Sequence, residues 1–211
     1  SLNSITNGDY NNAMGNRSLK NNTTGNYNTA VGNSSLKDNV SGNNNTAFGQ
    51  ASLQNTTASN NVAFGYQSAL ANTSGTRNIA IGYQAYNAAD TEDDNLAIGY
   101  DALGGAIAGG EFNVAIGNYS LDANTVGDGN VAVGYDALTA NTQGMQNVAV
   151  GQNALGGALV TGSRNIALGV NSASATISGA CNIAIGNAAY NAAAAGACNI
   201  ALGESAMGGS L

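Results

Sequence analysis

One five-residue phrase returns along the whole chain at an almost constant interval. The phrase is Asn-x-Ala-φ-Gly, where φ is an apolar residue, and it occurs twelve times. Of the eleven steps between copies, eight have a length of 17, one of 16 and two of 18. The copies end at Gly15, Gly32, Gly49, Gly65, Gly82, Gly99, Gly117, Gly134, Gly151, Gly169, Gly186 and Gly203. A fixed period decides the fold before any local pattern does, because each repeat is one unit stacked on the next.

A period of this length is too short for a helix pair, a leucine-rich repeat or a propeller blade. It fits one coil of a parallel β-solenoid with two short strands and two turns. The phrase itself, as at residues 113–117, supplies the first strand, since Val and Ile favour strands. The second strand is expected to begin near a recurring Ser/Ala-Leu pair, as at residues 35–40. The sequence therefore predicts an all-β chain, a β-roll of about twelve 17-residue coils, as a single repeat array over residues 1–211.

The asparagine that opens each phrase is expected to form a ladder along the rod. Neighbouring coils should lie about 4.8 Å apart, as neighbouring strands do, so identical positions stack. Buried amides need hydrogen-bond partners, which the stack and the turn backbone would supply. The predicted structural ladder comprises Asn28, Asn45, Asn61, Asn78, Asn95, Asn113, Asn130, Asn147, Asn165, Asn182 and Asn199.

Alternation along the strand gives the phrase two different faces. Because a thin coil has little room inside, we expect its Ala to point inward with the Leu of the second strand. The Val and Ile residues then form an outward stripe that is larger than a soluble monomer normally exposes. Other copies of the chain would cover it, which predicts a side-by-side homotrimer. The alternative is the reverse orientation, with Val and Ile inside a monomeric rod. The predicted stripe comprises Val114, Ile116, Val131, Val133, Val148, Val150, Ile166, Leu168, Ile183 and Ile185.

The composition argues against most kinds of chemistry. There is no His, which leaves no imidazole base, no Ser-His triad and no common zinc site. Five basic residues and a net charge of −7 argue against nucleic-acid binding. No apolar run is long enough for a transmembrane helix, so this segment is not expected to insert into a membrane. We expect no enzyme activity, no catalytic residue and no cofactor.

One acidic cluster interrupts the repeat at Asp90, Glu92, Asp93 and Asp94. Calcium binds several oxygen ligands close together, so these carboxylates are a candidate cation site. The alternative interpretation is a solvated turn without a ligand.

Two cysteines, Cys181 and Cys198, are one repeat period apart and so occupy one position in adjacent coils. Their Cα atoms would lie within disulfide range, although parallel Cβ vectors suit a disulfide poorly. The alternative is a pair of small apolar turn residues. No further Cys or His is present to complete a metal set.

Aromatic residues recur in phase just after the repeat glycine. Tyr66, Tyr83 and Tyr100 are expected to form a three-rung ladder, with Tyr135 in the same phase further on. Repeated rows of Tyr, Asn, Ser and Thr on an outer face could bind a sugar or a matrix protein weakly at many places.

The phrase "NVAIG" at residues 113–117 resembles the repeat in the heads of trimeric autotransporter adhesins. The phrase "NTAVG" at residues 28–32, with a Leu and a Gly turn after it, is similar to the repeat shafts of phage tail fibres. The resemblance covers essentially the whole chain, although the adhesin head repeat is shorter than the period of this chain. It implies a left-handed β-roll in a homotrimer, on a cell surface or virion. It also implies a rigid rod that positions or provides binding to a host glycan or protein receptor.

Neither end of the sequence carries a polar cap of the kind that terminates a free solenoid. We therefore expect a section of a longer fibre or, as the alternative, a self-stacking subunit of an extracellular filament. Ice binding is disfavoured, because the row that starts with Thr29 and Thr46 continues with Val62 and Ile79. A carbohydrate-active solenoid would need a constellation of carboxylates, and none stands out.

Overall fold

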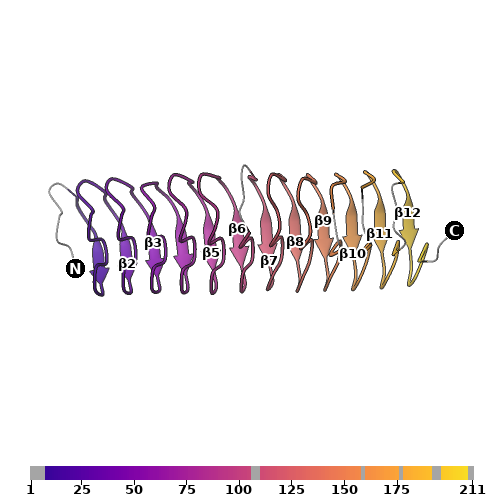
Figure 1. The fold of residues 1–211 in the computed structure, drawn as a ribbon, viewed down its shortest axis with the longest axis horizontal. Coiled ribbons are helices and arrows are strands. Elements are labelled where there is room, and N and C mark those ends of the chain that lie inside the picture. The colour runs from indigo at the N-terminus through magenta and orange to yellow at the C-terminus, as the bar shows by residue number, and fades with distance from the viewer. Residues whose placement is uncertain (1–7, 106–109, 158–159, 176–177, 192–195, 209–211) are drawn as a thin grey trace.

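The chain forms a rod of stacked coils with the N-terminal and C-terminal coils at opposite ends (Figure 1). This computed structural model describes residues 8–105, 110–157, 160–175, 178–191 and 196–208. Each coil contributes one strand of three residues. The strands are β1 (Asn12–Met14), β2 (Thr29–Val31), β3 (Thr46–Phe48), β4 (Val62–Phe64), β5 (Ile79–Ile81), β6 (Leu96–Ile98), β7 (Val114–Ile116), β8 (Val131–Val133), β9 (Val148–Val150), β10 (Ile166–Leu168), β11 (Ile183–Ile185) and β12 (Ile200–Leu202).

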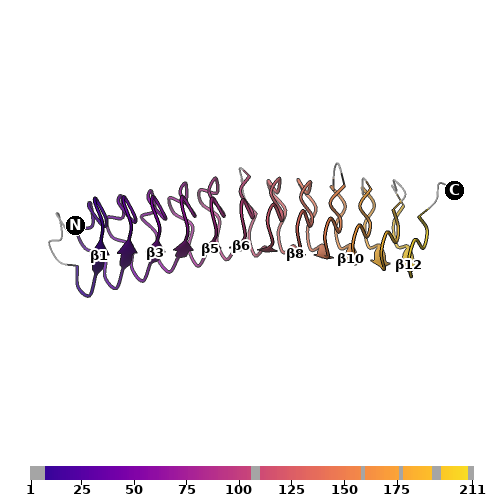
Figure 2. The same ribbon diagram turned by 90° about the horizontal axis from the view of Figure 1, so that it is seen from below.

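The twelve strands form one parallel sheet in sequence order, which confirms the all-β solenoid. Equivalent residues pair across every step, as Ala30 does with Ala47. The shortest step pairs Thr46 with Val62, and one of the longest pairs Leu96 with Val114. The strands therefore keep one register, and the turns absorb each change in length. Figure 2 shows the strands along one side of the rod and the turns extending away from it.

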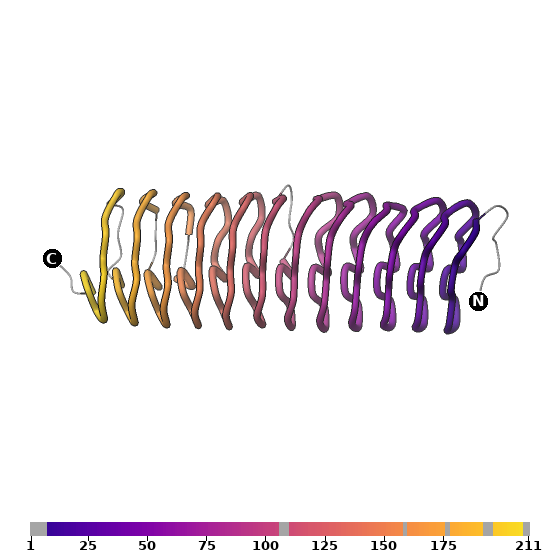
Figure 3. The backbone as a smooth tube through the Cα atoms, turned by 180° about the vertical axis from the view of Figure 1, so that it is seen from behind, coloured from indigo at the N-terminus to yellow at the C-terminus, as the bar shows by residue number. Residues whose placement is uncertain are grey.

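The expected second strand is not present among the described residues. The segment in which it was expected is a run of turns, in which Ser34 and Leu36 have φ values of 59° and 48°. These are left-handed conformations, whereas β-strands require negative φ. The turns still stack through backbone hydrogen bonds, because Leu36 N–H donates to the Ser52 carbonyl at 3.1 Å. Figure 3 shows these turns side by side in successive coils.

The interior of the rod is narrow and consists mainly of Ala and Leu. Within β2 the central Ala30 is 0% exposed, and Leu36 from the following turn is equally buried. The residues on either side of Ala30 face outward and are partly exposed. This inward Ala and outward Val or Ile pattern repeats through the sheet, so the prediction of the strand orientation is confirmed and the reverse orientation is wrong.

The glycine that ends each phrase lies where two coils approach most closely. Gly82 has φ of 140°, and a Cβ atom there would lie 2.3 Å from the Gly99 carbonyl oxygen. The same close approach recurs at Gly65 and Gly117. Only a residue without a side chain fits where another coil follows, which explains the glycine in the first eleven copies.

Candidate functional site: the outer surface of the rod

A continuous apolar face covers the outward side of the sheet from β4 to β12. The residues that flank the central Ala of each of these strands form a surface that we call the apolar face. They are Val62, Phe64, Ile79, Ile81, Leu96, Ile98, Val114, Ile116, Val131, Val133, Val148, Val150, Ile166, Leu168, Ile183, Ile185, Ile200 and Leu202. All ten residues of the predicted stripe belong to it. Their side chains are partly exposed to solvent, and exposure within the face reaches 63% at Leu202.

The face changes character in the first three strands. There the first outward position is polar, with Asn12, Thr29 and Thr46. The second outward position stays apolar, and Phe48 stacks on Phe64 with ring centroids 4.5 Å apart. The apolar face is thus two side chains wide over its nine strands, and in β1 to β3 a single row of apolar side chains continues it.

The asparagine ladder lies inside the rod and connects successive coils. Asn130 N–H donates to Asn113 Oδ1 at 2.9 Å, and its Nδ2 donates to the Gly144 carbonyl at 2.9 Å. Its own Oδ1 accepts the N–H of Asn147 at 3.0 Å. The link from backbone N–H to the preceding Asn Oδ1 is made by every predicted member, from Asn28 to Asn199. Since both polar atoms of the side chain are occupied by the protein, the ladder stabilises the stack and is not suited to hold a ligand.

An exposed tyrosine ladder runs along the middle of the rod. Tyr83 stacks between Tyr66 and Tyr100, with ring centroids 5.1 Å apart on both sides. Tyr119, which was not among the predicted members, contacts Tyr100 and Tyr135 edge to face at 5.2 and 6.0 Å. The five rings form one continuous row. Because the three stacked rings cover one another's faces, the row presents mainly ring edges and hydroxyl groups to solvent.

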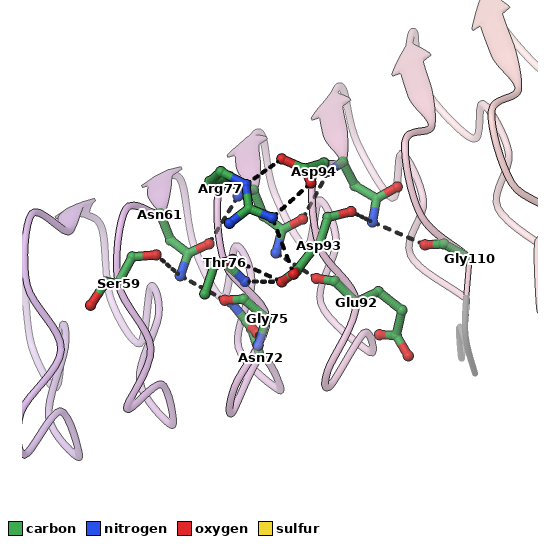
Figure 4. Close-up of polar contacts among 12 residues, drawn as sticks. Ser59, Asn61, Asn72, Gly75, Thr76, Arg77, Glu92, Asp93, Asp94 and Gly110 are labelled. Atoms are coloured by element: carbon green, nitrogen blue, oxygen red, sulfur yellow. Dashed lines mark hydrogen bonds and ion pairs between the residues drawn. The ribbon is translucent and has the colours of Figure 1, made fainter.

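The acidic turn is organised by a basic residue from the preceding coil (Figure 4). Arg77 Nε donates to Asp94 Oδ1 at 2.6 Å, and its second terminal nitrogen lies 3.2 Å from Asp93 Oδ2. The hydrogen bond with Arg77 holds the pKa of Asp94 below its usual range, and the same bond raises the pKa of Arg77. Asp93 Oδ1 also accepts the N–H of Thr76 at 2.6 Å. The two aspartates therefore tie one coil to the next.

The other two carboxylates of the cluster turn to different partners. Glu92 is buried, and its Oε2 accepts the backbone N–H groups of Asp90 and Thr91 at 3.1 Å. Asp90 Oδ1 accepts a hydrogen bond from the Thr73 hydroxyl. No three of the acidic or cysteine side chains in the described part of the chain are arranged to hold a metal ion. The four carboxylates thus do not meet at one cation site.

A second group of carboxylates lies in the coils that carry the tyrosine ladder. Burial raises the pKa of Asp122, and the charges of Asp101 and Asp136 add to the effect. Burial also raises the pKa of Asp101. The group was missed at the level of sequence because its members are far apart in the chain and only two of them share a phase of the repeat.

The two cysteines lie on the surface near the C-terminal end. Both Cys181 and Cys198 are exposed, and neither forms a disulfide in the structure. Each has φ of 60° and directly precedes an asparagine of the ladder.

Comparisons of the chain with known protein families, with curated proteins and with solved structures found no match. Within the described residues, no helix is long and apolar enough to cross a membrane.

Proposed function

We propose that this chain is a rigid rod segment of an extracellular fibre on a cell surface or virion. Its role is to hold a receptor-binding part at a distance or to contribute to receptor binding itself. Rigidity follows from the continuous hydrogen bonding, since both the strand and the turn of each coil bond to the next coil. The family resemblance of the repeat supports the same role.

The apolar face is the observation that carries this proposal. It runs over nine strands without an interrupting charge, which exceeds what a soluble monomer normally exposes. A second copy of the same chain offers a matching face of the same length and pitch. We therefore propose that copies associate side by side through this face, as three chains around a central seam. The rod would then be wide and stiff enough to act as a spacer.

Light scattering on the purified chain tests the assembly. A mass near three times 20.8 kDa is expected, with a rod-shaped profile in small-angle scattering. Replacing two neighbouring residues of the face, as in I116K/V133K, should reduce the mass to that of one chain because lysine charges cannot be buried in the seam. The matched control is A123K, in the turn that follows β7, where Ala123 is exposed and lies outside the apolar face.

A mass of 20.8 kDa for the unaltered chain at all concentrations would contradict the side-by-side assembly. A mass that grows steadily with concentration would instead favour end-to-end stacking into a filament.

The tyrosine ladder favours direct adhesion as a second candidate function. Tyrosine combines apolar contact area with a hydrogen-bonding hydroxyl at low entropic cost, and is therefore frequent in recognition surfaces. Five such residues in a row suit a host glycan or protein bound weakly at many points. Binding of the rod to host cells should fall in Y83A/Y100A and should be unchanged in Y10A/Y27A, which removes a stacked pair elsewhere. Equal binding by both variants would remove the ladder from consideration.

A further inference from the structure

Cys181 and Cys198 belong to a row of residues that runs along the whole rod. The positions directly before each asparagine of the phrase form a row that we call the outer turn row. Its members are Tyr10, Tyr27, Asn44, Asn60, Arg77, Asp94, Phe112, Gly129, Gln146, Arg164, Cys181 and Cys198. All of them have φ between 56° and 64°. Because the backbone conformation repeats, their side chains leave the coils in a common direction.

Consecutive side chains of the outer turn row touch each other at three places. The rings of Tyr10 and Tyr27 are stacked with centroids 5.0 Å apart. Asn44 Nδ2 donates to Asn60 Oδ1 at 3.3 Å. Arg77 and Asp94 form the ion pair described above. Side chains on adjacent coils in this row are therefore direct neighbours.

The cysteines occupy two consecutive places in the same row. Cys198 N–H donates to the Ala180 carbonyl at 3.0 Å, just as Asp94 N–H donates to the Thr76 carbonyl at 3.1 Å. The strands that follow are paired in register, with Ile183 opposite Ile200. The two thiols thus stand to each other as Arg77 stands to Asp94, and both are exposed and unbonded.

The coils that carry the thiols lack a contact that earlier coils have. In most coils, the residue directly before the member of the outer turn row has a side-chain oxygen. This oxygen accepts the backbone N–H of the equivalent residue in the preceding coil. Asn43 does so for Asn26 at 2.8 Å, and Ser163 does so for Met145 at 3.0 Å. At the last two positions the residues are Ala180 and Ala197, which have no side-chain acceptor. A bridge between the thiols would tie these coils where the polar tie is missing.

We propose that Cys181 and Cys198 together bind one soft, thiophilic monovalent cation of the copper(I) and silver(I) class. Equivalent atoms on adjacent strands are about 4.8 Å apart, longer than the Cβ separation of about 3.8 Å in a disulfide. A zinc–sulfur bond is about 2.3 Å long, and two metal–sulfur bonds of similar length in line span about 4.6 Å, which is close to the spacing of the coils. Thiolate ligands select soft ions over the harder divalent ions that carboxylates prefer.

Binding converts two thiols and one cation into an anionic dithiolate complex and releases two protons, with no change of oxidation state. Arg164 is the preceding member of the outer turn row, so its positively charged side chain leaves the coil next to that of Cys181 in the same direction. An arginine in this row reaches the following coil, as Arg77 does. The negative complex would therefore have a counter-charge.

Titration of the reduced full chain with silver(I), in a chloride-free buffer, tests the site. Native mass spectrometry should show one silver ion per chain, and a pH-stat should record two protons released per ion. Loss of either thiol in C181S or C198S should weaken binding by about 100-fold or more, because the second ligand is then no longer intramolecular. Hydrogen exchange in β12 should slow when silver binds.

The matched control is R164C/C181S, which keeps two cysteines in the outer turn row but places them two coils apart. It should bind silver as weakly as the single variants and show no slowing of exchange in β12. Wild-type affinity in C181S, in C198S or in this control would mean that the thiols act separately and would overturn the proposal. So would a purified chain that has lost two hydrogens in mass and contains no titratable thiol, since the pair would then be a disulfide.

Discussion

The phenolic oxygen of Tyr86 accepts a hydrogen bond from Nδ2 of Asn95, a member of the asparagine ladder, at 3.1 Å. The same hydroxyl donates to the carbonyl oxygen of Glu92 at 3.0 Å. Tyr86 is 1% exposed, and burial raises its pKa, so the ring is a neutral part of the core. In this coil it stands where most other coils have Leu.

The coil of Tyr86 differs from the coil of Leu36 at three positions that lie close together in the chain. In the coil of Leu36, Asn39 Nδ2 donates to the Gly42 carbonyl at 3.0 Å, and Asn39 Oδ1 accepts the Gly42 N–H at 2.9 Å. A Cβ atom on Gly42 would lie 2.0 Å from the Ala58 carbonyl oxygen and 2.5 Å from Asn39 Oδ1, so a coil with this Asn has room only for Gly at the second position. The coil of Tyr86 has Ala89 and Glu92 at these two positions. The tyrosine hydroxyl therefore supplies the polar group that Ala89 lacks.

Replacement of Tyr86 by Phe should destabilise the rod. The Glu92 carbonyl would lose one of its two donors and keep Asn78 Nδ2 at 2.7 Å, so the expected cost is the net value of one hydrogen bond, about 0.5–1.5 kcal/mol. Urea unfolding followed by circular dichroism gives the change. The control is Y66F, in the exposed tyrosine ladder, which should stay within about 0.5 kcal/mol of the wild type.

The triple variant Y86L/A89N/E92G tests whether these three positions act as a unit. It introduces the residues found in the coil of Leu36. Its free energy of unfolding should therefore be about 0.5–3 kcal/mol higher than the value obtained by adding the effects of the three single variants. Additive single effects would show that the three residues are independent.

Replacement of Gly82 by Ala should disrupt the contact between two coils. The added Cβ would lie 2.3 Å from the Gly99 carbonyl oxygen, and φ of 140° is itself unfavourable for Ala. We expect a loss of more than about 2 kcal/mol. Gly203 is the matched control, because its φ is 112° but nothing lies within 4 Å of its added Cβ. G203A should therefore show the conformational cost alone, and equal losses in both variants would contradict the steric explanation.

Replacement of Asn130 by Ala should weaken the stack on both sides of its coil. The Asn147 N–H would be left without its acceptor, at a cost of about 1–3 kcal/mol, whereas the Gly144 carbonyl would lose Asn130 Nδ2 but keep Asn141 Nδ2 as a donor. Hydrogen exchange should accelerate first at the amide of Asn147. The variant N16A, which changes an exposed asparagine outside the ladder, should leave the exchange at that amide as in the wild type.

Asp122 should make stability depend on pH in the direction opposite to an ion-paired carboxylate. Its pKa is raised in the folded chain, so the stabilisation by its proton is present below the ordinary carboxyl pKa and is lost as pH rises through the folded value. D122N should thus be more stable than the wild type at pH 7, by less than about 1 kcal/mol because the group is partly exposed. The difference should vanish near pH 3, below the ordinary value of about 3.9.

The control for this experiment is D9N, at an exposed aspartate of the first described coil. It should follow the wild type at both pH values. A constant advantage of D122N at all pH values would point to packing instead of charge.

The strand of each coil could be predicted from the sequence because strict alternation and small interior volume leave one orientation. Ala30 is inside and Val31 outside for the reason that a coil of this size cannot hold two layers of branched side chains. The pairing register also follows from the repeat, since equivalent residues such as Ala30 and Ala47 stack.

The turn segment could not be predicted in the same way. Leu36 adopts φ of 48°, a conformation that Leu rarely takes, so the conformational preference of Leu does not predict it. It is sustained by burial of the Leu side chain and by the hydrogen bond to Ser52, both of which exist only once coils are stacked.

Two further contacts of the outer surface follow from features of the sequence. Tyr119 lies one residue out of phase with Tyr100 and Tyr135, yet an aromatic side chain is long enough to close the gap. Arg77 and Asp94 carry opposite charges and are separated by one repeat length, so the sequence is sufficient to predict their ion pair.

Among the residues that the structure describes, each strand contacts only the strands that immediately precede and follow it in the chain. A coil can therefore be inserted or removed by a single duplication or deletion of one repeat in the gene, and the junction on either side stays the same. Each such event would change the rod by about 4.8 Å. The length of the rod can therefore change in equal increments while the surfaces of the remaining coils stay as they are.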